Sequence, residues 1–181
     1  MRKLKLQELN RLSLKDFKSA EKSPIVLVLD NIRSGLNVGS AFRTADGFAL
    51  EKIYLCGITA QPPHREILKT AIGASESVNW EFFEKSTDAI AFLKKQGYLI
   101  IAVEQAEGST SLPDFEWPKE KKIALVFGNE VRGVSTEVMN EIDICLEVPQ
   151  FGTKHSFNIS VCIGIVVWEL FRQWRYPERK P

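Results

Sequence analysis

The chain has 181 residues, 44% of them hydrophobic and 26% charged, which is the balance of an ordinary globular domain. This length predicts one domain with a substantial core. The net charge of +1 excludes nucleic acid binding through overall positive charge, so any such contact needs a local patch.

The cysteines and the apolar segments predict the compartment. Cys56, Cys145 and Cys162 lie in apolar stretches and are odd in number, which indicates buried thiols in a reducing compartment, without a metal site. We therefore expect a cytoplasmic protein. The N-terminus carries acidic residues, unlike a signal peptide, and the longest apolar run, 161–170, is too short to span a bilayer.

Residues 1–23 alternate charges with leucines, which favours a short amphipathic helix that forms an arm. Residues 24–176 are predicted to form one domain, followed by a tail at 177–181. Continuous apolar runs predict buried strands at 25–30, 52–56, 78–83, 98–104, 123–127 and 143–148. Helices are predicted at 41–48, at 65–72, from a cap at Ser86 or Thr87 to Gly97, after Ser135, and at 159–170. This alternation predicts an α/β fold, with a mostly parallel sheet flanked by helices.

The first unusual loop, residues 30–46, leaves a buried strand and enters the helix expected at 41–48. A helix N-terminus suits an anion such as phosphate. Arg43 is expected in the first helical turn, where the helix dipole opposes a cation, so its presence suggests an anionic partner. The alternative is an exposed Arg43 in a weak ion pair with Asp46, and both interpretations stay open.

The second unusual loop, residues 127–134, follows the strand expected at 123–127. Gly128 and Gly133 flank Glu130 there, at a strand end where backbone can approach a ligand closely. A turn with a solvated carboxylate explains the same residues.

The third unusual loop, residues 148–160, joins an apolar strand to an apolar helix. Ser156 and Asn158 are good N-cap residues, but the loop holds more polar groups than one cap needs. Because ligands of α/β proteins bind at strand ends, we interpret this loop as a site. His155, beside Lys154, is interpreted as a polar loop residue and not as a base.

Several common sites are absent from the sequence. No strand is followed by G-x-G-x-x-G, and there is neither a Walker A motif nor a G-x-S-x-G elbow. His64 and His155 lack the Cys or His partners that zinc would need.

Together, the three loops resemble the SpoU/TrmH family of SPOUT RNA methyltransferases. The matching motifs occur in order over about residues 25–175: Asn37-Val38-Gly39 with Arg43, Phe127-Gly128-Asn129-Glu130 with Gly133, and Val148-Pro149 with Ser156-Phe157-Asn158-Ile159-Ser160 and Glu169. The resemblance implies a methyltransferase that uses S-adenosylmethionine (SAM) to methylate a ribose 2′-hydroxyl of RNA. It also implies a C-terminal trefoil knot and a homodimer with its site at the subunit interface. The small size favours tRNA over rRNA as the substrate.

The resemblance also assigns residues to roles. The reaction centre would consist of Arg43, Asn37, Glu130, Ser156 and Asn158. Because a guanidinium is a poor base, we interpret Arg43 as a clamp for phosphate and for the forming alkoxide. The expected cofactor contacts are Val103, Glu104, Phe127, Gly128, Val148, Pro149 and Phe157. The candidate RNA contacts, each also explained as a solvated surface charge, are Arg33, His64, Arg65, Lys69, Arg132 and Lys154.

Three alternatives remain open at this stage. They are a non-catalytic RNA-binding or assembly factor on the same fold, an α/β enzyme for a small nucleotide or phosphorylated metabolite, and a small-molecule methyltransferase. Trp168, Phe171 and Trp174 have helical spacing, which favours a core or dimer interface over base stacking.

Overall fold

The computed structural model describes residues 1–118 and 120–177. Its centre is a seven-stranded sheet in the order β3-β2-β1-β6-β4-β7-β5, in which every pairing is parallel. The strands are β1 (Ser23–Asp30), β2 (Leu50–Cys56), β3 (Trp80–Phe83), β4 (Tyr98–Val103), β5 (Thr110–Ser111), β6 (Lys122–Phe127) and β7 (Ile144–Glu147). The helices are α1 (Leu14–Ser19), α2 (Gly35–Gly47), α3 (Arg65–Ala71), α4 (Ala74–Ser77), α5 (Ser86–Lys95), α6 (Thr136–Met139) and α7 (Ile159–Arg175), with short 3-10 helices at η1 (Leu6–Leu9) and η2 (Leu112–Asp114).

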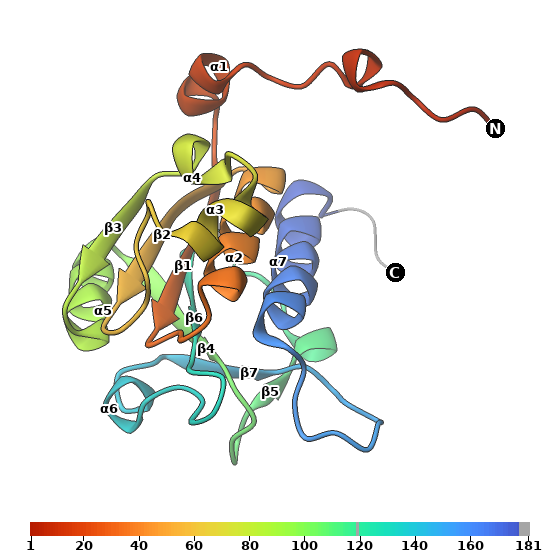
Figure 1. The fold of residues 1–181 in the computed structure, drawn as a ribbon. Coiled ribbons are helices and arrows are strands. Elements are labelled where there is room, and N and C mark those ends of the chain that lie inside the picture. Colours follow the sequence, from red (N-terminus) through yellow and green to blue (C-terminus); the bar gives the residue numbers. More distant parts are fainter. Residues whose placement is uncertain (119, 178–181) are drawn as a thin grey trace.

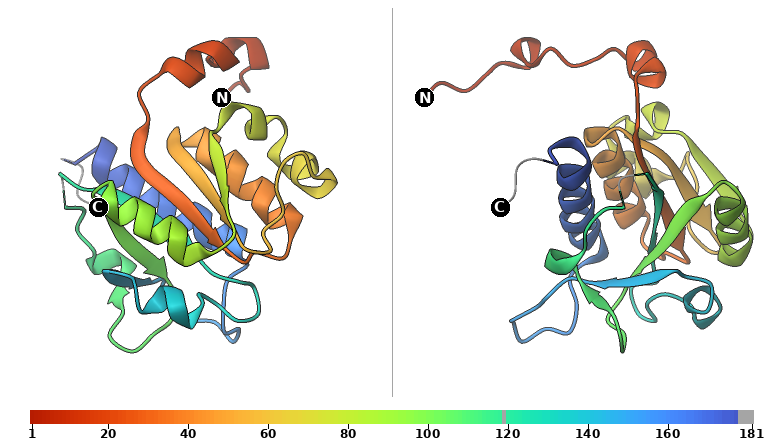
Figure 2. Two further views of the ribbon diagram at one scale, coloured as in Figure 1. Left: turned by 90° about the vertical axis from the view of Figure 1, so that its left-hand side faces the viewer. Right: turned by 180° about the vertical axis from the view of Figure 1, so that it is seen from behind.

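Two apolar cores lie on opposite faces of the sheet, because successive residues of a strand point in opposite directions. Ile25, Leu27 and Leu29 of β1 belong to the core that includes residues of α2, α3 and α7. Val26 and Val28 belong to the core that includes residues of α5 and α6. Helices therefore cover both faces (Figures 1 and 2), which confirms the predicted α/β class.

The helix that follows β1 begins six residues earlier than predicted. It starts at Gly35, because the Ser34 side chain accepts from the Asn37 backbone N–H at 3.3 Å and caps it. Arg43 consequently lies in the third turn of α2 and not in the first. The prediction that the helix dipole opposes its charge was therefore wrong. The alternative ion pair with Asp46 is not formed either, because Asp46 accepts from the Ser77 hydroxyl instead.

Other boundaries differ in informative ways. Lys85, not Ser86 or Thr87, is the N-cap of α5, because the Ser86 hydroxyl is turned inward to Asp30. The predicted end holds, since Gly97 follows the cap with a φ of +80°. The region between β4 and β6, expected to be a loop, contains β5 and η2. The last helix continues one turn beyond residue 170, to Arg175.

The N-terminal arm is not one amphipathic helix. It holds η1 and α1, of which α1 contacts α4, and most of its side chains are exposed. The arm projects away from the sheet (Figures 1 and 2). Of the predicted tail, residues 178–181 lie outside the described part of the chain. Among the described residues, none of the helices has the length and apolar character needed to cross a bilayer.

Candidate functional site

An open cavity of about 810 Å³ lies at the carboxyl ends of β4 and β6 and is bordered by the third loop. Parallel strands present their carboxyl ends at one edge of the sheet, so loops that are distant in sequence meet there. Ten of the residues expected at a site line this cavity: Val103, Glu104, Phe127, Gly128, Glu130, Arg132, Val148, Ser156, Phe157 and Asn158. Pro149, which was also expected, follows Val148 but is not part of the lining.

Glu130 reaches from the second loop to the start of α2. Its two carboxylate oxygens accept the backbone N–H groups of Arg33 at 2.9 Å and Ser34 at 3.0 Å, and the Asn37 side-chain N–H at 3.0 Å. Partial burial raises the pKa of Glu130, but these donors outweigh it and hold the pKa below its ordinary value. The carboxylate is therefore ionised at neutral pH, and both of its oxygens are engaged.

Asn37 connects the first loop to the third. Its side-chain oxygen accepts from the Asn158 amide at 3.3 Å, a long contact, while its nitrogen donates to Glu130. Asn158 also caps α7, because its side-chain oxygen accepts the Ser160 N–H at 2.9 Å. The predicted capping role is confirmed for Asn158, and one continuous set of hydrogen bonds joins the three motifs.

Arg43 lies outside this cavity. It lines a separate hollow of about 440 Å³ together with Ser40, Thr44, Lys69, Thr70 and Ile72. The hollow forms where α2 and α3 pack closely, since a Cβ on Gly39 would overlap the Ile67 carbonyl. Two cations and three hydroxyls share it, without a carboxylate. Along the axis of α2, Arg43 lies about 9 Å beyond Asn37.

The other predicted RNA contacts are spread over the strand-end surface. Arg33 and Arg65 are exposed, and His64 is the N-cap of α3, where its ring nitrogen accepts from the Glu66 N–H at 3.3 Å. Lys154 is exposed in the third loop. Of the six candidates, the structure brings Arg132 to the cavity and Lys69 to the hollow beside Arg43.

Several lining residues were not identified from the sequence. Gln105 follows β4, and its side-chain amide donates to the His155 carbonyl at 3.0 Å, which ties the third loop to that strand. His155 also lines the cavity. Cys162 of α7 lies on its wall, where burial raises the pKa of the thiol to about 11, so it is not a thiolate at neutral pH. No sequence signal marked Gln105, because its role depends on the path of a loop 50 residues away.

The three motifs and their order are those of a known family. The sequence pattern of the SpoU rRNA Methylase family matches residues 24–168, which is most of the chain. The chain belongs to the SpoU rRNA methylase family. This confirms the resemblance drawn from the motifs, and it supports a methyltransferase over a non-catalytic RNA-binding factor.

Relatives of this SpoU family chain include proteins of bacteria. An uncharacterized tRNA/rRNA methyltransferase of Borreliella burgdorferi is 31% identical over 162 residues, which are 88% of this chain and 68% of that protein. A tRNA (guanosine(18)-2′-O)-methyltransferase of the same organism is 28% identical over 151 residues, which are 83% of this chain and 67% of that protein. The crystal structure of an AdoMet-bound rRNA methyltransferase from Sinorhizobium meliloti superposes with a TM-score of 0.78 at 26% identity. That match covers 87% of this chain and 59% of the other, so this chain spans less than two thirds of that protein.

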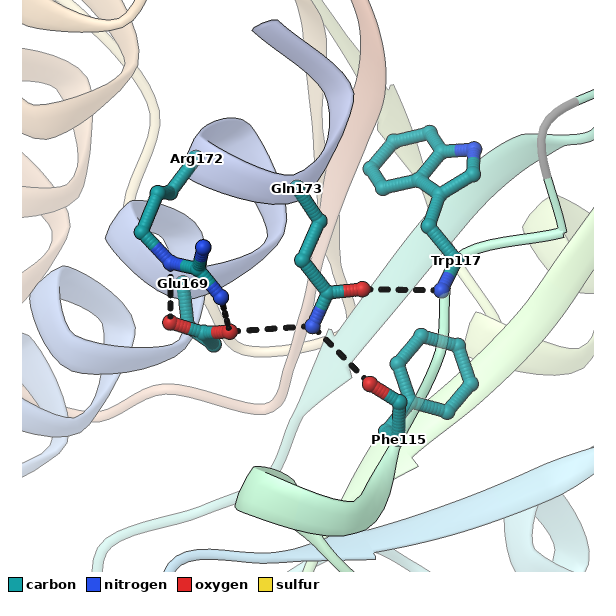
Figure 3. A network of polar contacts seen from close by, with 5 residues as sticks. All are labelled: Phe115, Trp117, Glu169, Arg172 and Gln173. Atoms are coloured by element: carbon teal, nitrogen blue, oxygen red, sulfur yellow. Dashed lines mark hydrogen bonds and ion pairs between the residues drawn. The ribbon is translucent and has the colours of Figure 1, made fainter. Parts of the chain in front are cut away.

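Glu169 of α7 lies one residue beyond the matched range and is not part of the cavity lining. It pairs with Arg172 at 2.6 Å and accepts from the Gln173 amide at 3.0 Å. Gln173 in turn donates to the Phe115 carbonyl at 2.9 Å and accepts the Trp117 N–H at 2.8 Å (Figure 3). This network fastens α7 to the segment between η2 and β6. The N-terminus of α7 forms part of the cavity wall, and this network holds the same helix in place near its C-terminus.

Proposed function

We propose that this chain transfers a methyl group from SAM to a ribose 2′-hydroxyl of RNA. One observation carries the proposal. Residues of the second and third motifs line the same cavity, and two of them, Glu130 and Asn158, are hydrogen-bonded to Asn37 of the first motif. Its volume is within the usual range for a site that binds a cofactor-sized ligand. The AdoMet-bound state of the Sinorhizobium meliloti relative supports SAM as that ligand.

SAM fits the chemistry of the cavity wall. Val103, Phe127, Val148 and Phe157 offer apolar surface for a purine ring, and the backbone from Gly128 offers polar groups at a close approach. Pro149 and Glu104 complete the proposed contacts. When bound there, SAM supplies an electrophilic methyl group on a sulfonium.

The residues of the reaction centre have different roles. Glu130 is a positioning residue, because both oxygens of its ionised carboxylate are held by donors at the start of α2. Asn37, Ser156 and Asn158 orient the ribose at the cavity mouth, where the hydrogen bond from Asn158 to Asn37 keeps the two amides together.

Arg43 is the clamp of the proposed reaction. It stays charged at any physiological pH and can hold a backbone phosphate in its own hollow. Because this hollow is separate from the SAM cavity of the same chain, its contact with the developing alkoxide is made across the interface of the proposed homodimer. Lys69 shares its hollow and supports the same phosphate contact. Arg33, His64, Arg65, Arg132 and Lys154 form the remaining basic rim, with phosphate contacts that position the RNA.

The assembly and the substrate belong to the same proposal. Residues 24–176 form the methyltransferase domain, and residues 1–23 form an arm on it. A homodimer is supported by apolar side chains on α7 that stay exposed in one chain, with Val161 51% and Trp168 49% exposed. A trefoil knot at the C-terminus goes with the family fold. The relative that acts on tRNA supports tRNA as the substrate, with rRNA as the other class. Three free cysteines support a cytoplasmic location.

Binding and transfer experiments test the proposal in order. In calorimetric titrations, the protein should bind SAM and not NAD. With radiolabelled SAM, label should then appear in tRNA. At one position, the phosphodiester bond that follows the methylated ribose should resist alkaline hydrolysis. Absence of SAM binding would overturn the proposal. Label in rRNA alone would keep the reaction and overturn the choice of tRNA. Mapping of 2′-O-methyl sites in RNA from a deletion strain would identify the nucleotide.

A further inference from the structure

Asp30 is a buried carboxylate at the end of β1. It is the last residue of β1, and only 1% of its surface is exposed. It lies in register with Cys56 of β2, and strand alternation places it on the face of Val26 and Val28. Within residues 1–118 and 120–177, Asp30 forms no ion pair. A carboxylate in apolar surroundings is costly unless hydrogen bonds compensate, so its donors indicate what it stabilises.

Three donors from three segments surround Asp30. Oδ1 accepts from the Ser86 hydroxyl at 2.5 Å and from the Asn31 side-chain amide at 2.8 Å. Oδ2 accepts the backbone N–H of Ser135 at 2.9 Å. Ser86 begins α5 and Ser135 is the N-cap of α6, so the carboxylate lies where helix N-termini favour negative charge.

Ser135 terminates the loop that forms much of the cavity wall. Every residue from 128 to 134 lines the cavity. Both ends of this loop are held at the end of β1, because the Asn129 amide donates to the Asn31 carbonyl at 2.7 Å and Ser135 donates to Asp30. The Val134 N–H also donates to the Glu104 carboxylate at 3.0 Å, which fixes the C-terminal end of the loop to the residue that follows β4.

We propose that Asp30 is a positioning residue for the cofactor, which holds the loop of residues 128–135 in the shape that binds SAM. Asp30 does not line the cavity and acts through the Ser135 N–H. The inference rests on SAM as the ligand of the cavity. Without this anchor the loop leaves the competent shape for part of the time, and the apparent affinity falls in proportion to the competent fraction.

Two variants remove the anchor from opposite sides. Asp30→Asn keeps the size of the side chain, but its single carbonyl oxygen cannot serve all three donors. Ser135→Pro removes the N–H donor, together with a hydroxyl that makes no capping hydrogen bond, at a residue whose φ of −62° suits proline. Each should raise the Kd for SAM about tenfold, and the double variant should bind no more weakly than the weaker single one. In hydrogen exchange, the Val134 amide should lose protection in both variants.

Ser23→Ala is the matched control. Ser23 is equally buried, at 1% exposure, but lies at the opposite end of β1, where its hydroxyl donates to the Phe48 carbonyl at 3.1 Å. This variant should lose stability without a change in SAM affinity. If both anchor variants bind SAM as tightly as wild type, or if Ser23→Ala weakens binding equally, the inference is wrong. If Asp30→Asn does not fold, Ser135→Pro alone decides. Failure of the wild-type protein to bind SAM would instead contradict the proposed function.

Discussion

The side-chain amide of Asn37 donates to the carboxylate of Glu130 across 3.0 Å, although 93 positions separate the two residues in the chain. Glu130 takes two further donors from the backbone at the start of α2. The second motif is thus fastened to the first before any ligand binds. A site arranged in this way loses little ordering entropy when cofactor and RNA arrive.

Arg43→Ala should separate catalysis from cofactor binding. Arg43 lies in its own hollow on α2 and not on the cavity wall. We expect kcat to fall by at least about 100-fold, as for loss of a group that stabilises developing charge, with SAM affinity unchanged. Single-turnover methylation and calorimetry measure the two effects. Arg175→Ala, at the end of α7, is the control. A folded Arg43→Ala protein that no longer binds SAM would contradict the assignment.

Glu130→Gln should change the dependence of stability on pH. The pKa of folded Glu130 lies below its ordinary value, so the carboxylate stabilises the fold above about pH 4.3 and this is lost as the pH falls through the folded pKa. We expect the variant to melt at a lower temperature than wild type at pH 7, and the difference to shrink as the pH falls below about 4.3. Because Glu130 is exposed to solvent, its contribution should not exceed about 1 kcal/mol. Thermal melts across this pH range measure the difference, and a difference that does not shrink as the pH falls below about 4.3 would refute the prediction.

Gly133→Ala should distort the loop of residues 128–135. Gly133 has a φ of +70°, and a Cβ there would overlap the Glu104 carboxylate, which accepts the next backbone N–H. We expect a loss of about 1–3 kcal/mol in the free energy of unfolding and weaker SAM binding. Urea denaturation and calorimetry check both. Gly47→Ala, in α2 with open space around it, should be neutral or stabilising by up to about 1 kcal/mol. Equal effects of the two substitutions would count against the role of Gly133.

Gln173→Ala should loosen the support of α7. It removes partners from the Trp117 N–H and the Phe115 carbonyl, both in the segment before β6 (Figure 3). Because Phe115 and Trp117 are buried, loss of these bonds should cost about 1–3 kcal/mol, measured by urea denaturation. Gln61→Ala, in an exposed loop, is the control and should change stability little. Unfolding of the variant at the wild-type urea midpoint would show that the network does not support the helix.

The strands were predictable because each is a continuous apolar run, as parallel strands buried on both faces must be. The start of α2 was missed because Leu36 and Asn37 do not mark a helix by pattern, and the cap at Ser34 counts only once the chain turns there. The cap of α5 was misplaced for a related reason. Ser86 has the chemistry of a cap, but its hydroxyl is committed to Asp30, a residue 56 positions away.

Sequence alone determined the fold class, the family and the identity of the motif residues, because apolar periodicity and motif order are properties of the chain itself. Only the tertiary structure decided where these residues lie relative to the cavity and which role each can have. It separated Arg43 from the cavity, turned Glu130 towards the start of α2, and placed Asp30 behind the loop it anchors. These relationships depend on which strand ends meet at one edge of the sheet. That is decided by long-range packing of parallel strands, which no local pattern records.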